Sequence, residues 1–583
     1  MVNNKIEVLD KGNSEDILIE KLEEDDGITI YRIKVKYEHS VYPQRVSLSF
    51  AADGTDVFSV WSPTHTDERS IKPNWHPNIS VSRACDGAPI QSALSRSGKN
   101  RLTLALSDPK TPLELKMGIR ENDVWLVAMI DIFTLPVAKI DYYEADLRID
   151  TRSVEFYDAI KEVRTWWNGY GYKNAKVPEA AKVPVYSTWY SFHQHFDFDA
   201  IVKECEASKE YGCETVILDD GWQTEDYSSG YAFCGDWEAC AAKVGDMAEL
   251  AERIHALDMK LILWFSVPYV GKNSKAWERF KECFLNDPQK GEWHCLDPRF
   301  PKVREYLIKL YSKAAKEWKL DGFKLDFIDS FTLTDYSIGR IGCGRDVDSI
   351  EDAVEILLRD IMKSLKKINS DICIEFRQKY IGPLMQTYGN MLRVSDCPAD
   401  SLKNRVGMVD LRLLSGATAV HSDMLEWNYT DTPENAATQF VNVLYAVPQI
   451  SVISEKLKPE HKRVLNFYSN FWKEHKNILI DGEFKAFAPW ANYSAVSAEK
   501  DGTIIYTAYE SRVTEIGSPF EKLVLINGTG KNGLVLDYSS IESITGRNCI
   551  IYDCTGRERY TYNLVQEELR YIPVPNMGMA VIE

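Results

Sequence analysis

Eight short apolar segments between residues 185 and 454 alternate with segments of helical periodicity, and this alternation limits the folds open to the chain. The segments are 185–190, 215–220, 260–265, 322–327, 371–376, 391–396, 417–422 and 449–454. Continuous apolar runs of this length are typical of parallel strands that are covered by helices. Eight such strands close a (β/α)8 TIM barrel. We therefore predict this barrel in the middle of the chain.

The segment that follows Pro301 shows the helical period most clearly. Its apolar residues recur every three or four positions along one face: Val303, Tyr306, Leu307, Leu310, Tyr311, Ala314 and Trp318. This spacing predicts a helix that packs one face on the barrel. The fifth connection, residues 380–390, is too short for a full helix.

The regions on either side of the barrel have a different texture. Residues 1–165 contain short alternating runs such as 28–37, separated by Gly, Asp, Asn and Pro, and this pattern predicts a β-sandwich. The same texture returns near residue 484. We predict an N-terminal β-sandwich over 1–165, the barrel over 166–483 and a second all-β sandwich domain over 484–583.

Composition excludes several classes of partner. The 583 residues carry a net charge of −18, which repels phosphate backbones and anionic membrane surfaces, so we expect neither nucleic acid nor a membrane as a partner. The amino terminus lacks the apolar core of a signal peptide, which favours a cytoplasmic protein, although a protein trimmed of its signal would look the same. The 12 cysteines include no Cys-x-x-Cys pair and are expected to be reduced and mostly buried. A homo-oligomer is left open.

Charged and aromatic residues gather at the carboxyl ends of the predicted strands, where a TIM barrel places its chemistry. In chain order these ends carry Trp189 with His193 and His195, Asp219 with Asp220 and Trp222, Trp264, Lys324 with Asp326, Glu375 with Arg377, Arg393 with Asp396, and His421 with Asp423. Indole rings stack on the C–H faces of sugars, and carboxylates and cations bind hydroxyls. The set therefore predicts a monosaccharide pocket, with helix capping and core packing as the alternatives for a single Asp or Trp.

Lys324 and Asp326 are the most informative of these residues. They stand two positions apart in a predicted strand, so both side chains leave the same face, and a buried Lys needs an ionic partner. A second strand end supplies Asp396. Two carboxylates on either side of a glycosidic bond are what its hydrolysis requires.

The pair His193 and His195 raises a rival interpretation, because His-x-His after the first strand also begins a metal-dependent amidohydrolase site. That site needs further His ligands from the fifth and sixth strands. No His occurs between His294 and His421, so the ligand set is incomplete and we predict no metal.

Three motifs resemble, in order and spacing, those of glycoside hydrolase family 36, the α-galactosidases. They are Leu218-Asp-Asp-Gly-Trp-Gln223, Phe323-Lys-Leu-Asp-Phe327 and Arg393-Val-Ser-Asp-Cys-Pro-Ala-Asp400. The resemblance covers most of the barrel and implies the same three-part architecture. It also implies an oligosaccharide or glycoside as substrate and no cofactor.

Carried over residue by residue, the resemblance implies a retaining double displacement with Asp326 as nucleophile and Asp396 as acid/base. Asp219 and Asp220 would bind sugar hydroxyls O4 and O6, Lys324 would reach O3 and O4, and Arg393 would lie near O2 and the nucleophile. Trp189, Trp222, Trp264, Arg377 and Asp423 complete the expected substrate-binding set. We expect Lys324 and Arg393 to keep Asp326 anionic, and Asp396 to hold its proton near neutral pH.

One departure concerns the fifth strand, where many family members have a Cys-x-x-Gly-Gly-Gly-type turn near the substituent at C2. This chain reads 374–380 as Ile-Glu-Phe-Arg-Gln-Lys-Tyr, and its bulky charged residues alter what the pocket accepts at that carbon. An exo-acting α-galactosidase is the leading prediction. The alternatives are an α-N-acetylgalactosaminidase or another α-glycosidase for an axial-O4 sugar, an α-galactosyl transglycosidase, and a carbohydrate-binding protein on a degenerate barrel.

Overall fold

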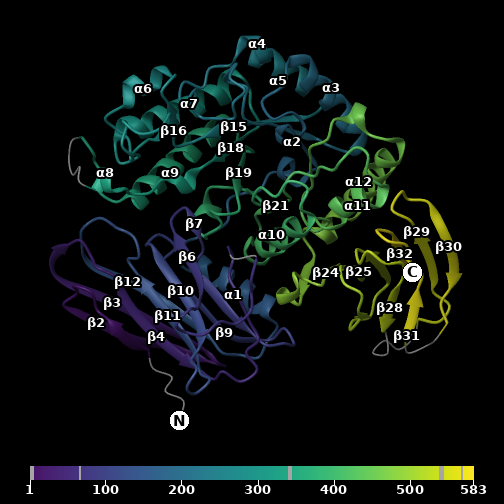
Figure 1. Cartoon of the computed structure of the whole chain (residues 1–583), viewed down its shortest axis with the longest axis horizontal. Coiled ribbons are helices and arrows are strands. Elements are labelled where there is room, and N and C mark those ends of the chain that lie inside the picture. The colour runs from purple at the N-terminus through teal and green to yellow at the C-terminus, as the bar shows by residue number, and fades with distance from the viewer. Residues whose placement is uncertain (1–5, 65–66, 339–343, 538–543, 566–568) are drawn as a thin grey trace.

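A computed structural model describes residues 6–64, 67–338, 344–537, 544–565 and 569–583. Three regions follow one another along the chain and lie side by side in Figure 1: paired β-sheets at the N-terminus, a β/α barrel above them, and a smaller group of strands at the right.

Two six-stranded antiparallel sheets form the N-terminal region. One has the order β1 (Glu7–Asp10), β4 (Val46–Ala52), β11 (Leu126–Ile132), β10 (Leu113–Ile119), β6 (Asn78–Arg83), β7 (Asp86–Gly87), and the other has β2 (Asp16–Asp25), β3 (Ile28–Val41), β12 (Ile140–Asp150), β9 (Asn100–Leu106), β8 (Ile90–Leu94), β5 (Ser59–Trp61). Both sheets contribute to one core, in which Leu113, Leu115 and Met117 of β10 are buried while Glu114 and Lys116 reach outward. This alternation is the period of a strand with one buried face.

The barrel consists of eight parallel strands, one at each predicted segment. Their order is β21 (Ala419–His421), β20 (Met391–Arg393), β19 (Cys373–Arg377), β18 (Gly322–Asp326), β15 (Lys260–Ser266), β14 (Thr215–Leu218), β13 (Val185–Ser187), β22 (Gln449–Ile450). Parallel bridges from His421 to Val447 and from Leu425 to Ile450 bring the two end strands together, so the barrel is nearly closed. The eight strand predictions are confirmed.

Helices connect these strands and cover the barrel. They are α1 (Phe156–Asn168), α2 (Trp189–Phe192), α3 (Phe198–Ser208), α4 (Ala241–Val244), α5 (Met247–Ala256), α6 (Lys275–Phe280), α7 (Pro301–Glu317), α8 (Asp335–Ile338), α9 (Ile350–Ile368), α10 (Ser401–Leu414), α11 (Pro433–Val441) and α12 (Pro459–Leu479). The helix predicted after Pro301 is α7, and it buries Val303, Leu307 and Tyr311 as expected. The fifth connection holds only the 3-10 turn Met385–Thr387 among its helical residues, which confirms that it is too short for a full helix.

The C-terminal strands form two further sheets. The larger has the order β23 (Glu483–Phe487), β24 (Ala495–Lys500), β25 (Thr503–Ala508), β27 (Lys522–Asn527), β32 (Met579–Ile582), β29 (Asn548–Tyr552), β30 (Glu558–Asn563), and the smaller has β26 (Val513–Glu515), β28 (Leu534–Asp537), β31 (Leu569–Ile572). They share a core that includes Leu523, Leu536 and Ile572. The all-β texture predicted for both ends of the chain is therefore present. The domain boundaries themselves stay a prediction, and α1 runs across the one placed at residue 165.

A buried polar network joins the three regions. Asp410 of α10 is fully buried and accepts hydrogen bonds from Trp61 Nε1 at 2.8 Å, from Arg69 Nη2 at 2.6 Å and from the Tyr493 hydroxyl at 2.5 Å. Trp61 and Arg69 come from the N-terminal region, whereas Tyr493 precedes β24. The charges of Arg69 and Asp410 compensate each other away from water.

The described cysteines are all free, and nine of the eleven are buried, as the sequence predicts; Cys343 lies outside the described residues. Each described helix is too short or too polar to span a lipid bilayer.

Candidate active site

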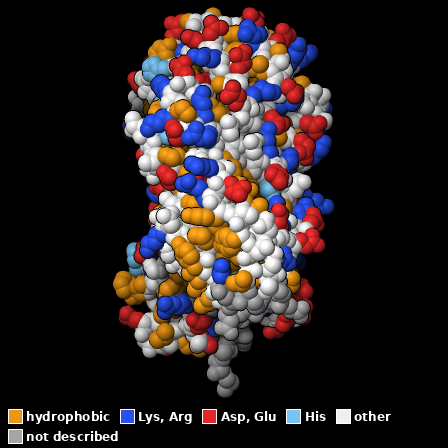
Figure 2. Space-filling model, turned by 90° about the vertical axis from the view of Figure 1, so that its right-hand side faces the viewer, with side chains coloured by type: hydrophobic (Ala, Val, Ile, Leu, Met, Phe, Trp, Pro, Cys, Tyr) orange, Lys and Arg blue, Asp and Glu red, His pale blue; other side chains and the backbone are white. Residues whose placement is uncertain are grey.

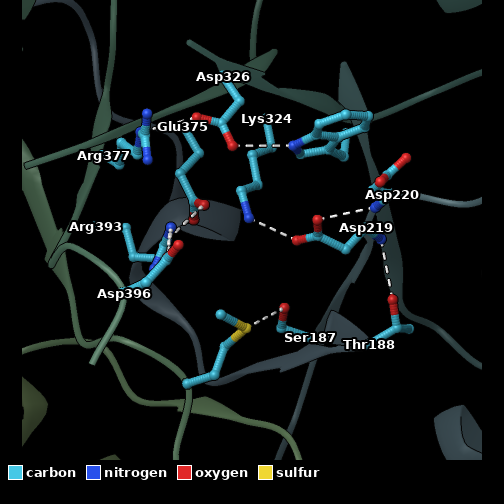
Figure 3. A network of polar contacts seen from close by, with 12 residues as sticks. Ser187, Thr188, Asp219, Asp220, Lys324, Asp326, Glu375, Arg377, Arg393 and Asp396 are labelled. Carbon is cyan, nitrogen blue, oxygen red and sulfur yellow. Dashed lines mark hydrogen bonds and ion pairs between the residues drawn. The ribbon is translucent and has the colours of Figure 1, made fainter. Parts of the chain in front are cut away.

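Charged side chains from several barrel strands converge at the carboxyl end of the barrel. Figure 3 shows them around a common space, with Asp326 on one side, Asp219 and Asp220 on another, and Arg393 with Asp396 on a third. Strand ends of a parallel barrel point to the same face, so residues far apart in sequence meet there. The predicted convergence of these residues is observed.

Asp326 is the last residue of β18, and its carboxylate is held by several donors. Its Oδ1 accepts the Phe327 backbone N–H at 2.8 Å and forms an ion pair with Arg377 Nε at 2.9 Å. Its Oδ2 accepts the Trp264 indole N–H at 3.1 Å. Only 7% of Asp326 is exposed. These contacts fix the orientation of the carboxylate and leave Oδ2 with the greater capacity for a new bond.

Lys324 leaves the same strand two residues earlier, but its partner is not Asp326. Its ammonium group contacts Asp219 Oδ2 at 2.5 Å, and both residues are buried. The expectation that the buried Lys is ion-paired is confirmed. Asp219 directly follows β14, which is separated from β18 by β15, so the long Lys324 side chain reaches past one strand across the barrel interior.

Asp220 follows Asp219 and is held by two glutamine side chains. Gln194 Nε2 donates to its Oδ2 at 2.8 Å, and Gln223 Nε2 donates to its Oδ1 at 2.7 Å. Burial raises the pKa of Asp220 to about 6, and these two donors oppose that rise. The side chain of Asp220 therefore changes charge close to neutral pH.

Arg393 lies in β20 and is almost fully buried among three carboxylates. Its Nη2 donates to Asp396 Oδ1 at 2.8 Å, its Nη1 donates to Asp423, and its Nε lies 3.7 Å from Glu375 Oε1. Burial raises the pKa of Glu375 and of Asp423. Asp396 differs from both, because half of its side chain is exposed to the space in Figure 3.

The geometry corrects the expected charge state of Asp396. The positive charge of Arg393 lowers the pKa of Asp396 to about 2, so this carboxyl is ionised near neutral pH in the structure. We predicted that Asp396 would hold its proton and that Arg393 would lie near Asp326. Instead Arg393 extends toward Asp396 and Asp423, and the cation beside Asp326 is Arg377.

Two further residues lie away from the place predicted for them. Trp222 is completely buried between barrel and helices, where its ring packs on Trp237, Phe265 and Trp318 and its N–H donates to the Trp264 carbonyl. Asp423 is also fully buried and accepts hydrogen bonds from Tyr190 and the Cys397 N–H. Trp222 is therefore a packing residue, and Asp423 orients Arg393 from behind.

The residues around the first strand do not form a metal site. The His193 ring packs on Trp189, which is half-buried and begins α2. The His195 ring instead stacks on Tyr227. Gln194 between them is the side chain that points toward Asp220. Among the described residues, no group of three His, Cys, Asp or Glu side chains is arranged to hold a metal ion.

Sequence reasoning missed several polar residues of the site. Gln194 and Gln223 hold Asp220, Gln449 Nε2 donates to Glu375 at 2.5 Å, and Tyr190 donates to Asp423 at 2.8 Å. Gln449 was detectable, since it is polar and begins an apolar strand segment. The others lie in loops or a short helix, where polar residues are ordinary and carry no signal.

The N-terminal region braces the loops of this site. Arg83 donates to the Phe331 carbonyl at 2.9 Å and to the Asp329 carbonyl, and the Gly87 N–H donates to the Lys379 carbonyl at 2.5 Å. These loops follow β18 and β19, the strands that carry Asp326 and Arg377. The turn between β6 and β7 therefore supports both members of that ion pair.

Comparisons with known proteins relate part of the chain to one family. Residues 174–378 match the family model described as Melibiase, which covers the first five barrel strands. A segment of 92 residues is 30% identical to the bifunctional α-galactosidase/sucrose kinase AgaSK of Mediterraneibacter gnavus. It spans 15% of this chain and only 9% of that relative.

Solved structures show the same fold over nearly the whole chain. The galactosidase domain of AgaSK has a TM-score of 0.61 at 12% identity, covering 97% of this chain and 79% of that one. The family-36 α-galactosidase AgaA of Geobacillus stearothermophilus, solved with raffinose, has a TM-score of 0.61 at 12% identity, covering 96% and 79%. The α-galactosidase of Lactobacillus brevis has 0.61 at 11%, covering 99% and 84%.

The Melibiase match relates residues 174–378 to a family of glycoside hydrolases, and the solved structures show that the chain shares the fold of family-36 α-galactosidases. The family match covers 205 of the 583 residues, so it relates the first five barrel strands, and not the whole chain, to that family.

Proposed function

We propose that this protein is a retaining, exo-acting α-galactosidase that releases terminal α-linked galactose from oligosaccharides. The observation that carries the proposal is the placement of two carboxylates in unlike surroundings at one barrel end. Asp326 is buried and oriented by Trp264 and Arg377, whereas Asp396 is half exposed and paired with Arg393. A fixed nucleophile and a more accessible proton carrier are the two parts of a double displacement.

In the first step, Asp326 Oδ2 attacks the anomeric carbon while Asp396 protonates the departing oxygen. The bond to the leaving group breaks and a covalent galactosyl–enzyme ester forms. In the second step, Asp396 takes a proton from water, which attacks the same carbon and returns Asp326 to its anionic form. Asp219, Asp220 and Lys324 bind the sugar hydroxyls.

The ion pair with Arg393 sets a condition on this mechanism. The pKa of Asp396 in the free protein is about 2, because the Arg393 guanidinium stabilises its carboxylate form. Asp396 can therefore act as an acid only after this electrostatic interaction has been weakened. The substrate supplies that change in our proposal, because a sugar between Arg393 and Asp396 excludes water and draws the Arg393 donors toward its own hydroxyls. Arg393 remains compensated by Asp423 and Glu375.

A screen of nitrophenyl α- and β-glycosides tests the proposed activity. We expect turnover of the α-galactoside and little turnover of the β-anomer or of α-glucosides. NMR spectra recorded during the reaction should show α-galactose as the first product, as retention requires. A β-galactose product would reject the retaining mechanism, and added sugar acceptors would reveal transfer to another sugar in place of hydrolysis.

Asp220 gives a prediction for the pH dependence. We propose that its ionised form accepts sugar hydroxyls, so kcat/KM should rise as pH increases through about 6, where this carboxyl loses its proton. The Gln194→Leu variant removes a donor that favours the carboxylate, and it should move this limb upward by about one pH unit. The measurement is the pH profile of kcat/KM.

The matched control for this shift is Gln439→Leu, which removes a glutamine of α11 that donates to the Ala399 carbonyl. It should leave the limb in place. If Gln194→Leu leaves the rise of kcat/KM at the same pH, a group other than Asp220 determines that rise.

Arg377 gives a prediction for the sugar. If the end of the fifth strand lies near C2, as the resemblance implies, a guanidinium held on Asp326 leaves less room there than a glycine turn. We expect the native protein to prefer a hydroxyl at C2 over an N-acetyl group. Arg377→Ala should lower kcat/KM for the galactoside by about 10²-fold, since a charge partner of the nucleophile is lost. It should also reduce the preference for the substrate with a C2 hydroxyl over the substrate with a C2 N-acetyl group.

Paired assays with nitrophenyl α-galactoside and nitrophenyl α-N-acetylgalactosaminide measure both effects. The conservative variant Arg377→Lys keeps a cation and should retain the preference. A native enzyme that favours the N-acetyl substrate would reverse the assignment in favour of an α-N-acetylgalactosaminidase.

A further inference from the structure

A polar groove with two exposed tyrosines lies between the C-terminal strands and the barrel. It has a volume of about 760 Å³, and its lining includes Glu434 of α11 together with Asn532, Arg559, Tyr560, Tyr571 and Asn576. Figure 2 looks at this side of the molecule and shows hydrophobic side chains, a class that includes Tyr and Pro, gathered on the lower half of the face. None of these residues belongs to the strand-end site.

The two tyrosines of the groove are both more than half exposed. Tyr560 on β30 is 55% exposed, and Tyr571 on β31 is 56% exposed. The Tyr571 ring is nonetheless held in place, because its hydroxyl donates to the Asn532 carbonyl at 3.3 Å and its ring packs directly on Gly533. A side chain at Gly533 would collide with that ring, so the contact depends on glycine.

The polar lining is preorganised as well. Arg559 is 45% exposed and pairs with Asp553 at 3.2 Å, while Asp553 is itself fixed by the Thr555 and Arg557 N–H groups. The side-chain carbonyl oxygen of Asn576 is buried and has no hydrogen-bond partner among the described residues. A buried acceptor without a partner is costly.

The chemistry of this lining selects one class of ligand. Exposed aromatic rings beside amide, carboxylate and guanidinium groups suit a molecule with C–H faces and many hydroxyls. Phosphate or sulfate groups are disfavoured, because the two carboxylates of Glu434 and Asp553 outnumber the one guanidinium. The volume lies within the range of about 300–1,000 Å³ for small-molecule sites.

We propose that this groove is a second saccharide-binding site, which holds a neutral oligosaccharide or polysaccharide chain apart from the strand-end site. Its place suits such a role. Helix α11 follows strand β21, and a barrel helix begins at the end of the barrel where its preceding strand finishes. Glu434 in the first turn of α11 therefore lies toward the end that carries Asp326, and a chain held in the groove stays on that side.

Affinity electrophoresis of the full chain tests this proposal. The probes are soluble neutral polysaccharides in the gel, namely a galactomannan, a β-glucan and an arabinoxylan, with heparin as an anionic comparison. We expect at least one neutral polysaccharide to retard the protein. The double variant Tyr560→Ala/Tyr571→Ala should weaken that binding about tenfold or more.

Two control variants separate ring stacking from damage to the fold. Tyr560→Phe/Tyr571→Phe keeps both rings and should keep most of the retardation. Tyr42→Ala removes a tyrosine that is 46% exposed outside this groove and should leave retardation unchanged. Turnover of nitrophenyl α-galactoside should be the same in these two controls and in Tyr560→Ala/Tyr571→Ala, because the substituted residues lie outside the catalytic machinery.

The outcomes also distinguish this proposal from the proposed activity. Three results would each overturn the proposed saccharide site. They are no retardation by any neutral polysaccharide, retardation that survives Tyr560→Ala/Tyr571→Ala, and retardation by heparin alone. If the tyrosines are needed for retardation but the protein does not cleave α-galactosides, the saccharide site is supported and the proposed α-galactosidase activity is rejected.

Discussion

Replacing Asp326 by Asn should reduce kcat for α-galactosides on the order of 10⁴-fold, or about 5 kcal/mol of transition-state stabilisation. The amide is too weak a nucleophile to attack the anomeric carbon, and it cannot form the ester that splits the reaction into two steps. The Asn side chain has the same shape, so the loss should appear in kcat with an unchanged fold. Steady-state kinetics with a nitrophenyl α-galactoside measure it.

Asp329→Asn is the matched control, because Asp329 follows three residues later and contacts the same cation, Arg377 Nη2, at 3.4 Å. We expect less than a tenfold loss there. A comparable loss in both variants would point to disturbed electrostatics around Arg377 and away from a nucleophile at Asp326.

Azide distinguishes the roles of the two carboxylates. In Asp326→Ala, azide should attack the sugar from the vacated side and give β-galactosyl azide. In Asp396→Ala, azide should attack the galactosyl–enzyme ester and give α-galactosyl azide, because that variant still has its nucleophile. The opposite configurations would exchange the two assignments.

Replacing Asp410 by Ala should cost about 3–5 kcal/mol of unfolding free energy, the largest stability effect we expect from a single substitution. The change leaves the Arg69 guanidinium buried without its charge partner, and it removes the acceptor of Trp61 and Tyr493. These partners come from different regions of the chain. We therefore expect the regions to loosen from one another before each unfolds.

Urea unfolding followed by tryptophan fluorescence, together with limited proteolysis, measures this loss. Asp371→Ala is the control. It breaks an exposed ion pair in which Asp371 Oδ1 lies 2.7 Å from Lys176 Nζ, and such a pair should contribute about 0–1 kcal/mol to the free energy of unfolding. The double variant Arg69→Met/Asp410→Leu removes both charges and should recover much of the stability. A cost below about 1 kcal/mol for Asp410→Ala would contradict the role given to this network.

The barrel was predictable because its strands are buried on both sides. The strand 260–266 contains an unbroken buried apolar run from Leu261 to Phe265, and a run of this kind is visible without knowledge of the fold. The candidate site was predictable for a related reason. Lys324 and Asp326 interrupt an apolar strand with charge, and such an interruption is costly unless the residues are used.

The pairing of these charges was not predictable in the same way. Lys324 meets Asp219 across 105 positions, and Arg393 turns toward Asp396 and Asp423 while Arg377 occupies the place beside Asp326. Each choice depends on side-chain reach and on which carboxylates surround a given cation. Trp222 also shows the limit, since its motif suggested a sugar contact but its side chain points into the packing layer.

The sequence by itself determined the eight strand segments, the all-β regions at each end and the residues that gather at the strand tips, because strand burial and period act locally along the chain. The tertiary structure alone decided which cation faces which carboxylate. It thereby decided that Asp396 begins ionised and that Asp410 ties three regions together. Coulomb energies depend on distances across the fold, and neighbours in sequence do not define those distances.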